Sequence, residues 1–175
     1  MKPLLVSGES LEVDDVVAVA GGRRVELDPR SLPRMMRSRA AVEQIVREGQ
    51  VVYGITTGFG RFKDKIISPD EVRRLQLNLV RSHAAGVGPD LTAQEVRAML
   101  LIRANTLAIG HSGVRPEVVQ ILLDMLNAGV HPRVPLQGSL GASGDLAPLA
   151  HLALVLVGEG EAHTAGEILP GAEAL

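Results

Sequence analysis

The chain has 175 residues, 46% of them hydrophobic and 22% charged, which is enough for one domain with a sizeable core. Only 2% are aromatic, so the core must be built from aliphatic side chains, which favours packing of helix on helix. A net charge of −2 argues against a nucleic-acid or membrane-surface role, and the absence of cysteine excludes disulfides and thiolate metal sites.

Short strands and helices alternate in the first fifty residues. Residues 3–7 are expected to form a strand, and Ser10 is expected to cap a helix that ends at Gly21-Gly22. Residues 24–27 alternate in polarity, as a second strand would. Asp28-Pro29 then reads as the start of a long helix, because aspartate caps helices and proline suits their first turn.

Residues 50–67 change character and are predicted to be mainly loop, after an extended Val51-Val52-Tyr53. Three helices follow, over residues 68–85, 92–109 and 116–128. Their starts carry capping residues or a first-turn proline, in the sequences SPDE (68–71), TAQE (92–95) and RP (115–116).

The last part of the chain holds the most apolar segment. Residues 130–144 contain two prolines and several glycines and are predicted to be irregular. Asp145 is expected to cap a helix reaching Val157, apolar almost all round and therefore buried on every side. That stretch is too short to span a bilayer, which takes ~20 residues, so a soluble cytoplasmic protein is predicted. A hairpin is predicted over residues 161–169.

The glycine-rich segment GSLGASGD, residues 138–145, admits several interpretations. It can be a turn into the next helix, with Ser143 or Asp145 as the N-cap. A phosphate cradle is disfavoured because no lysine follows the last glycine, and a serine nucleophile because no strand leads into it. Alternatively, the unhindered Gly144 nitrogen attacks the Ala142 carbonyl, and loss of two waters leaves a ring with a methylidene group. Spacing alone does not choose among these.

Three separated segments resemble the aromatic amino-acid ammonia-lyases. They are YGITTGFG (53–60), NLVRSHAAGVG (78–88) and GASGDLAPLAH (141–151). The second of them is similar to the histidine-specific branch, and residues 105–135 are also similar, so the resemblance covers nearly the whole chain. It implies a mainly α, multihelical ammonia-lyase/fumarase-like fold, with a few short strands in this part.

The resemblance also implies the chemistry. Ala142, Ser143 and Gly144 would cyclise autocatalytically into 4-methylideneimidazol-5-one (MIO), an electrophile that needs no metal or external cofactor. Tyr53 would be the general base that removes the β-proton of the substrate, helped by nearby positive charge. His83 would hydrogen-bond the imidazole of L-histidine, which would leave as trans-urocanate and ammonia.

Outside this resemblance, Tyr53 is more typical of a residue at the edge of a core, and His83 of a histidine satisfied at a helix end. Phe59 and Gly60 would help to close the pocket. The other histidines have no metal-like spacing and are expected to be structural; they are His111, His131, His151 and His163.

The family pattern extends past Leu175, so residues 1–175 are interpreted as an N-terminal domain that ends before a central bundle of long helices. The family's sites are assembled from three subunits of a homotetramer, and the remaining pocket residues, an arginine for the substrate carboxylate among them, lie in that bundle. We therefore expect this chain alone to be inactive. A tyrosine or phenylalanine ammonia-lyase, an aminomutase, and a non-catalytic helical module remain as alternatives.

Overall fold

In a computed structural model of the chain, the described residues are 2–60, 63, 67, 69–140 and 145–175, with the backbone alone at residues 69 and 70. The helices are α1 (Val13–Ala20), η1 (Pro29–Ser31), α2 (Leu32–Glu48), α3 (Pro69–His83), α4 (Ala93–Ala108), α5 (Pro116–Ala128), α6 (Leu146–Leu156) and α7 (Gly171–Ala174). The strands are β1 (Leu4–Val6), β2 (Val25–Leu27), β3 (Val87–Asp90), β4 (His131–Pro132), β5 (Pro135–Gln137), β6 (Glu161–Thr164) and β7 (Glu167–Pro170). The predicted fold class, mainly helical with a few short strands, is confirmed.

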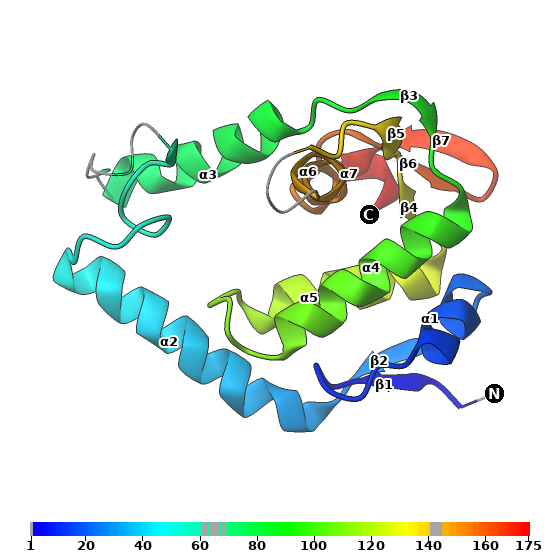
Figure 1. Cartoon of the computed structure of the whole chain (residues 1–175), viewed down its shortest axis with the longest axis horizontal. Coiled ribbons are helices and arrows are strands. Elements are labelled where there is room, and N and C mark those ends of the chain that lie inside the picture. Colours follow the sequence, from blue (N-terminus) through cyan, green and yellow to red (C-terminus); the bar gives the residue numbers. More distant parts are fainter. Residues whose placement is uncertain (1, 61–62, 64–66, 68, 141–144) are drawn as a thin grey trace.

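The helices form two layers with α2 along one side (Figure 1). Helices α3 and α6 pack together in one layer, and α4 and α5 pack together in the other. Helix α2 begins beside the parallel pair β1 and β2, and the loop that follows it leads across to α3. The loop between α2 and α3 carries Tyr53, and His83 is the last residue of α3, at the end that leads toward β3.

Helix α4 lies at the centre of the larger core and carries a buried charge. Leu100 and Leu101 are fully buried, and Arg97 is only 9% exposed. The Arg97 guanidinium donates from Nε to the Val19 carbonyl and from Nη1 to the Leu126 carbonyl, both at 2.8 Å. These carbonyls belong to the last turns of α1 and α5, where the helix dipole favours a cation. Burial lowers the pKa of Arg97, and the two carbonyls offset part of that cost.

Several helix boundaries follow the predicted local signals. At α4, Thr92 Oγ1 accepts the Glu95 N–H at 3.3 Å, and a Glu95 carboxylate oxygen accepts the Thr92 N–H at 2.7 Å. This is the predicted capping box. Gly49 and Gly129 end α2 and α5 in the left-handed region, at φ of 64° and 74°. Glycine reaches that conformation without the penalty of a Cβ.

The other predicted helix starts fare differently. Asp28 is confirmed as a cap, because its Oδ1 accepts the Arg30 N–H at 2.9 Å, although the turn that it caps is a short 3-10 helix. Ser10 is wrong as a cap: it lies at φ of 53°, and α1 begins only after Glu12. The expected cap at Ser68 lies outside the described residues.

The prediction that residues 130–144 are irregular is wrong over part of its described range. Strand β4 pairs antiparallel with β6, and β5 pairs antiparallel with β3, which was not predicted either. These strands are two to four residues long, and their partners are distant in sequence, so no local alternation marks them. The predicted hairpin is confirmed as β6 and β7, joined by Ala165 and Gly166 at φ of 49° and 87°. Such a pair of left-handed residues matches the twist of a tight hairpin.

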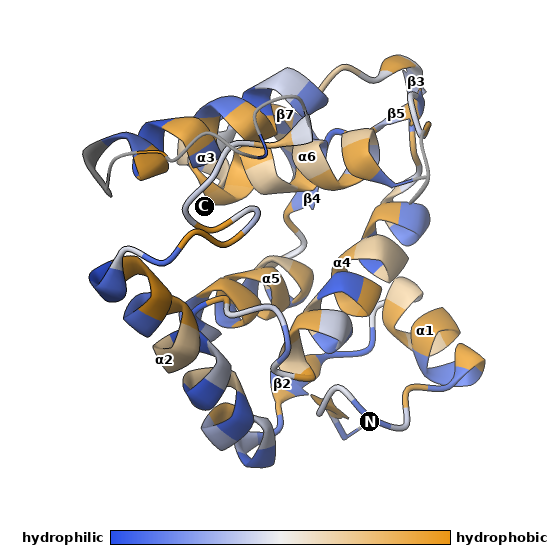
Figure 2. Ribbon diagram, turned by 60° about the vertical axis from the view of Figure 1, so that its left-hand side comes forward, coloured by the Kyte–Doolittle hydropathy of each residue, from blue (hydrophilic) through white to orange (hydrophobic). Residues whose placement is uncertain are grey.

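Helix α6 is less enclosed than its composition predicts. It is mostly hydrophobic (Figure 2), and Ala147, Ala150, Leu152 and Val155 are buried. Leu146, however, is 49% exposed, so the prediction that α6 is buried on every side is wrong for this chain. The reason is geometric: α3, α5 and α7 contact α6 but do not surround it. Among the described residues no helix is both long and apolar enough to cross a membrane.

Candidate active site

Tyr53 opens a tight turn that a buried threonine closes. The N–H groups of Ile55 and Thr56 both donate to the Val52 carbonyl, at 3.1 and 3.0 Å. The Thr56 hydroxyl accepts the Val52 N–H at 2.9 Å and donates to the Gln50 carbonyl. Because the turn occupies residues 53–56, the extended conformation predicted for Tyr53 is wrong. A side-chain hydroxyl supplies the partners that a neighbouring strand would have supplied.

The Tyr53 ring is held at the surface by Phe59. Its side chain is 62% exposed. The two rings meet edge to face, with centroids 5.8 Å apart and planes at 72°, a favourable arrangement for aromatic pairs. Gly54 lies between them at φ of 75°, and a Cβ there would come within 3.3 Å of the Phe59 ring. Glycine therefore permits both the turn and the ring contact, which leave the phenol accessible to a ligand.

His83 ends α3, and its own helix sets its tautomer. Nδ1 lies 2.8 Å from the Leu79 carbonyl and 3.1 Å from the Ser82 hydroxyl. A carbonyl can only accept, so this network assigns the hydrogen of the neutral imidazole to Nδ1 and leaves Nε2 with an acceptor lone pair. No described residue donates to that Nε2. The ring is thus presented with one nitrogen satisfied and the other available.

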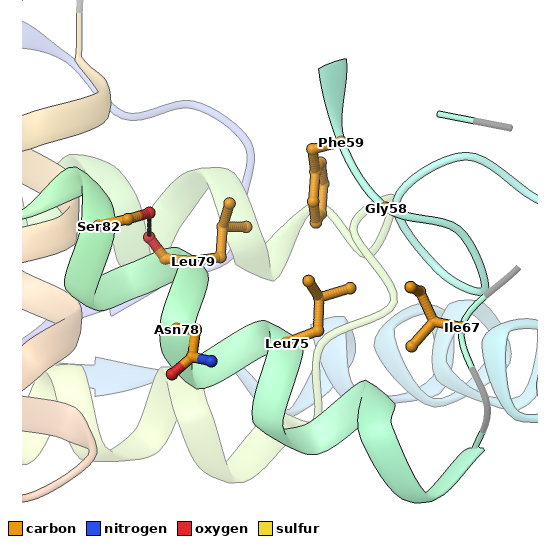
Figure 3. A pocket seen from close by; sticks show the side chains of 7 residues that line it. All are labelled: Gly58, Phe59, Ile67, Leu75, Asn78, Leu79 and Ser82. Atoms are coloured by element: carbon orange, nitrogen blue, oxygen red, sulfur yellow. Dashed lines mark hydrogen bonds between the residues drawn. The ribbon is translucent and has the colours of Figure 1, made fainter. Parts of the chain in front are cut away.

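A cavity of about 360 Å³ lies between the Tyr53 loop and α3 (Figure 3). It is lined by Gly58, Phe59, Ile67, Leu75, Asn78, Leu79 and Ser82. The Phe59 ring forms one wall, opposite the side chains of Leu75 and Leu79. The walls are mainly apolar, with Asn78 and Ser82 as polar groups, which is the usual character of a small-molecule site.

Tyr53 and His83, the two residues with predicted roles, each contact a residue that lines this cavity. Tyr53 packs on Phe59, which lines it from the loop, and His83 bonds to Leu79, which lines it from α3. Neither Tyr53 nor His83 is itself part of the lining. Neighbours of Tyr53 and of His83, from segments far apart in the sequence, thus line one space, and the roles of the two residues stay predictions.

The predicted electrophile, Ala142-Ser143-Gly144, lies outside the described residues. Its flanks are described: Leu140 is 84% exposed, and α6 begins directly after Asp145. The predicted cap at Asp145 is wrong, because its side chain makes no capping hydrogen bond. Its carboxylate lies 3.8 Å from the guanidinium of Arg103 on α4 instead. Asp145 thus keeps the N-cap position at the start of α6 without the predicted capping bond.

The described flanks of the tripeptide differ in their surroundings. Before it, a Cβ on Gly138 would lie 2.8 Å from the Gly86 Cα, so Gly138 packs closely against the segment that precedes β3. After it, the first amides of α6 receive no bond from the Asp145 side chain. Such amides carry the partial positive charge of a helix start, which would suit the one carbonyl oxygen of the MIO ring that the resemblance implies.

Two of the remaining histidines lie beside charged side chains. His131 Nε2 lies 3.5 Å from Arg97 Nη1, and burial, together with that charge, lowers the pKa of His131. His163 Nε2 lies 3.2 Å from the Asp90 carboxylate. Hydrogen bonds from Arg133 first, and from His163 next, hold the pKa of Asp90 below its ordinary value. In the part of the chain that the structure describes, no three His, Cys, Asp or Glu residues are placed to hold a metal.

Sequence reasoning did not single out Asn78 and Ser82 as cavity residues. The signal was present, because Leu75, Asn78, Leu79 and Ser82 follow the spacing of one helix face. Three of these four residues lie inside the NLVRSHAAGVG segment. Helical periodicity applied to that segment would have placed them on the same wall.

Comparison with known proteins agrees with this geometry. Residues 11–175 match the family described as aromatic amino acid lyase. A histidine ammonia-lyase of Gloeobacter violaceus is 62% identical over 98% of this chain and 34% of its own length. The structure of histidine ammonia-lyase from Trypanosoma cruzi is 40% identical, with a TM-score of 0.88 over 99% of this chain and 34% of that one. Tyrosine aminomutase from Streptomyces globisporus is 40% identical, with a TM-score of 0.91 over 99% of this chain and 33% of that one.

The chain spans about a third of the length of the curated relatives that it matches. The matched range, residues 11–175, spans the positions of Tyr53, His83 and Ala142-Ser143-Gly144. The chain belongs to the aromatic amino acid lyase family.

Proposed function

We propose that residues 1–175 form the N-terminal domain of a histidine ammonia-lyase, which converts L-histidine to trans-urocanate and ammonia without oxidation. The observation that carries the proposal is the 62% identity to the Gloeobacter violaceus histidine ammonia-lyase over 98% of the chain. The proposal assigns the substrate contact to His83, the base to Tyr53 and the electrophile to Ala142, Ser143 and Gly144.

The tautomer of His83 supports histidine as the substrate. With the hydrogen on Nδ1, Nε2 can accept the N–H of a substrate imidazole. A phenyl ring offers no such hydrogen, so a bound phenylalanine would leave that acceptor desolvated and unpaired, at a cost of ~1–3 kcal/mol. The site is therefore better suited to an imidazole than to a plain aromatic ring.

The exposure of Tyr53 supports its role as the base. Its ring packs on Phe59 while the residue stays 62% exposed, so its oxygen is accessible to a bound substrate, as a base that removes the β-proton must be. When formed from Ala142, Ser143 and Gly144, the MIO group supplies the electrophile that makes the substrate amine a better leaving group. The apolar walls of the neighbouring cavity would exclude water from the reacting carbon.

The complete enzyme is proposed to be a cytoplasmic homotetramer whose remaining pocket residues come from a central bundle of long helices. The coverage of about a third of each relative supports the need for further chain. The exposed Tyr53 and the incompletely covered α6 are consistent with faces that pack against other elements. On this proposal the chain alone does not turn over L-histidine.

The proposal is tested in the full-length protein. Addition of L-histidine should raise the absorbance of urocanate, and the mass of the tripeptide-bearing peptide should be lower by two waters. Ser143→Ala should abolish both signals. A folded wild-type protein that keeps its unmodified mass and forms no urocanate would instead support the non-catalytic helical module.

The second candidate is a tyrosine or phenylalanine ammonia-lyase or an aminomutase, favoured by the likeness to tyrosine aminomutase. His83→Leu should raise the KM for L-histidine strongly, whereas His83→Gln keeps an acceptor near Nε2 and should raise it less. If the wild-type protein prefers L-tyrosine or L-phenylalanine, the second candidate replaces the first. If His83→Leu leaves turnover of L-histidine unchanged, the substrate contact assigned to His83 is wrong.

A further inference from the structure

His151, in the second turn of α6, makes a hydrogen bond to a distant backbone amide. Its Nε2 accepts the Gly86 N–H at 3.1 Å. Because Nε2 accepts, the neutral ring carries its hydrogen on Nδ1. Gly86 lies three residues after His83, in the segment that leaves α3. The bond therefore ties the helix that follows the tripeptide to the chain that follows the substrate histidine.

Two glycines at the same point leave little or no room for a side chain. A Cβ on Gly86 would lie 3.0 Å from His151 Nε2 and 3.1 Å from Pro135 Cβ. A Cβ on Gly138 would lie 2.8 Å from the Gly86 Cα. The backbones of Gly86 and Gly138 are thus in contact, and His151 of α6 binds the Gly86 N–H beside them.

The strand pairing beside this contact extends it. Val87, which follows Gly86, pairs with Gln137, which precedes Gly138. Three segments therefore meet at one joint: the one after His83, the one before the tripeptide, and α6 after it. The separation between His83 and both flanks of the tripeptide is set at this joint.

The surroundings of His151 favour a neutral acceptor. Burial lowers the pKa of His151, and the nearby Asp90 carboxylate opposes that shift only in part. His151 lines a cavity of about 250 Å³ together with Asp90, Arg133 and Glu161, whose charges are paired with one another. Protonation would turn the ring nitrogen from an acceptor into a second donor facing the Gly86 N–H.

We propose that His151 is a positioning residue for the lyase reaction. By accepting the Gly86 N–H, it holds the segment after His83 against Gly138, and so sets the position of His83 relative to the described flanks of the tripeptide, Gly138 and α6. It touches neither the substrate nor the reacting atoms. The inference rests on the proposed function, and it goes beyond that function because it assigns a role to a histidine expected to be merely structural.

Three variants of the full-length protein separate positioning from packing. In His151→Gln, the amide reaches as far as the imidazole Nε2 and can still accept the Gly86 N–H. In His151→Asn, the matched control, the amide reaches only as far as Nδ1, so the bond is lost while polarity is kept. Gly86→Ala inserts a methyl group into the joint and leaves His151 intact.

Each variant is assayed for the fraction of chains lighter by two waters, for KM and kcat with L-histidine, and for the thermal midpoint. His151→Gln should stay within about twofold of the wild type in KM, because the acceptor remains. His151→Asn and Gly86→Ala should raise KM roughly tenfold and lower the cyclised fraction, since a partly buried donor loses its partner or its place. The thermal midpoints of the Gln and Asn variants should differ little.

The inference is overturned if His151→Asn matches His151→Gln in KM and in cyclised fraction. It is also overturned if the Asn variant loses activity only in proportion to the fraction of unfolded protein, with KM and ring formation unchanged. Absence of both ring formation and turnover in the folded wild type would refute the proposed function itself, and the inference with it. A normal wild type with an indifferent Asn variant refutes the inference alone.

Discussion

Replacing Arg97 by methionine measures how much of the core's stability depends on its buried guanidinium. Two hydrogen bonds from a charged donor, both at 2.8 Å, would be lost. At ~1.5–3 kcal/mol each, they amount to ~3–6 kcal/mol, and the Val19 and Leu126 carbonyls would be left unpaired. Removing a buried charge recovers part of this, because burying a cation is itself costly. The expected net loss is ~2–4 kcal/mol, a large part of the stability of a typical domain.

The loss is measured by urea unfolding of the 175-residue chain, followed by circular dichroism. Arg103→Met is the matched control: it removes an arginine from the same helix, whose partner among the described residues is the Asp145 carboxylate, 3.8 Å away. An exposed pair of this kind contributes ~0–1 kcal/mol. Equal losses in the two variants would refute the idea that the carbonyls of α1 and α5 depend on Arg97.

Two further predictions concern backbone space and acid stability. Gly110→Ala should cost several times more than Gly129→Ala in unfolding free energy, because both glycines have positive φ but only the Cβ at Gly110 meets backbone atoms of α2, at 2.8 and 2.9 Å. The Gly129 variant should lose only the conformational penalty of ~1–2 kcal/mol, and equal losses would rule out the steric account. Because the pKa of Asp90 is depressed in the folded state, its contribution is present above the unfolded pKa and is lost as pH falls through the folded one. Unfolding measured from pH ~6 to ~2 should show a weaker acid loss in Arg133→Met, and an unchanged profile would contradict the assignment.

The helices were predictable because their signals are local. Thr92 and Glu95 bond each other within one turn, and Gly129 ends α5 by its own conformation, so a short window of sequence contains the whole cause. Strand β3 is different: it contains Gly88 and Pro89, and its partner β5 lies more than forty residues away. Nothing within such a window indicates that pairing, which forms only after the helices have brought the two segments together.

The residues of the candidate site also divide into those that the sequence indicated and those that it did not. Tyr53 and His83 were identified through motif resemblance, and the structure brings their segments to one cavity; their roles stay predictions. The bond from His151 to Gly86 was missed, because no spacing relates a histidine on α6 to an amide sixty-five positions earlier. The Asp145 cap failed for a related reason, since Arg103 of another helix competes for its carboxylate.

Helix α2 has few buried side chains, and this affects how the site responds to ligands. Met35 is the buried residue of this helix, close to its start, and the helix then runs away from α4 and α5 toward the Tyr53 turn (Figure 1). Opening of its far end exposes little apolar surface, so that end and the turn should exchange their amide hydrogens faster than α4 does. A ligand that immobilises Tyr53 would slow this amide exchange at the C-terminal end of α2. Binding at the cavity would therefore be detectable as slower exchange in a helix that does not line the cavity.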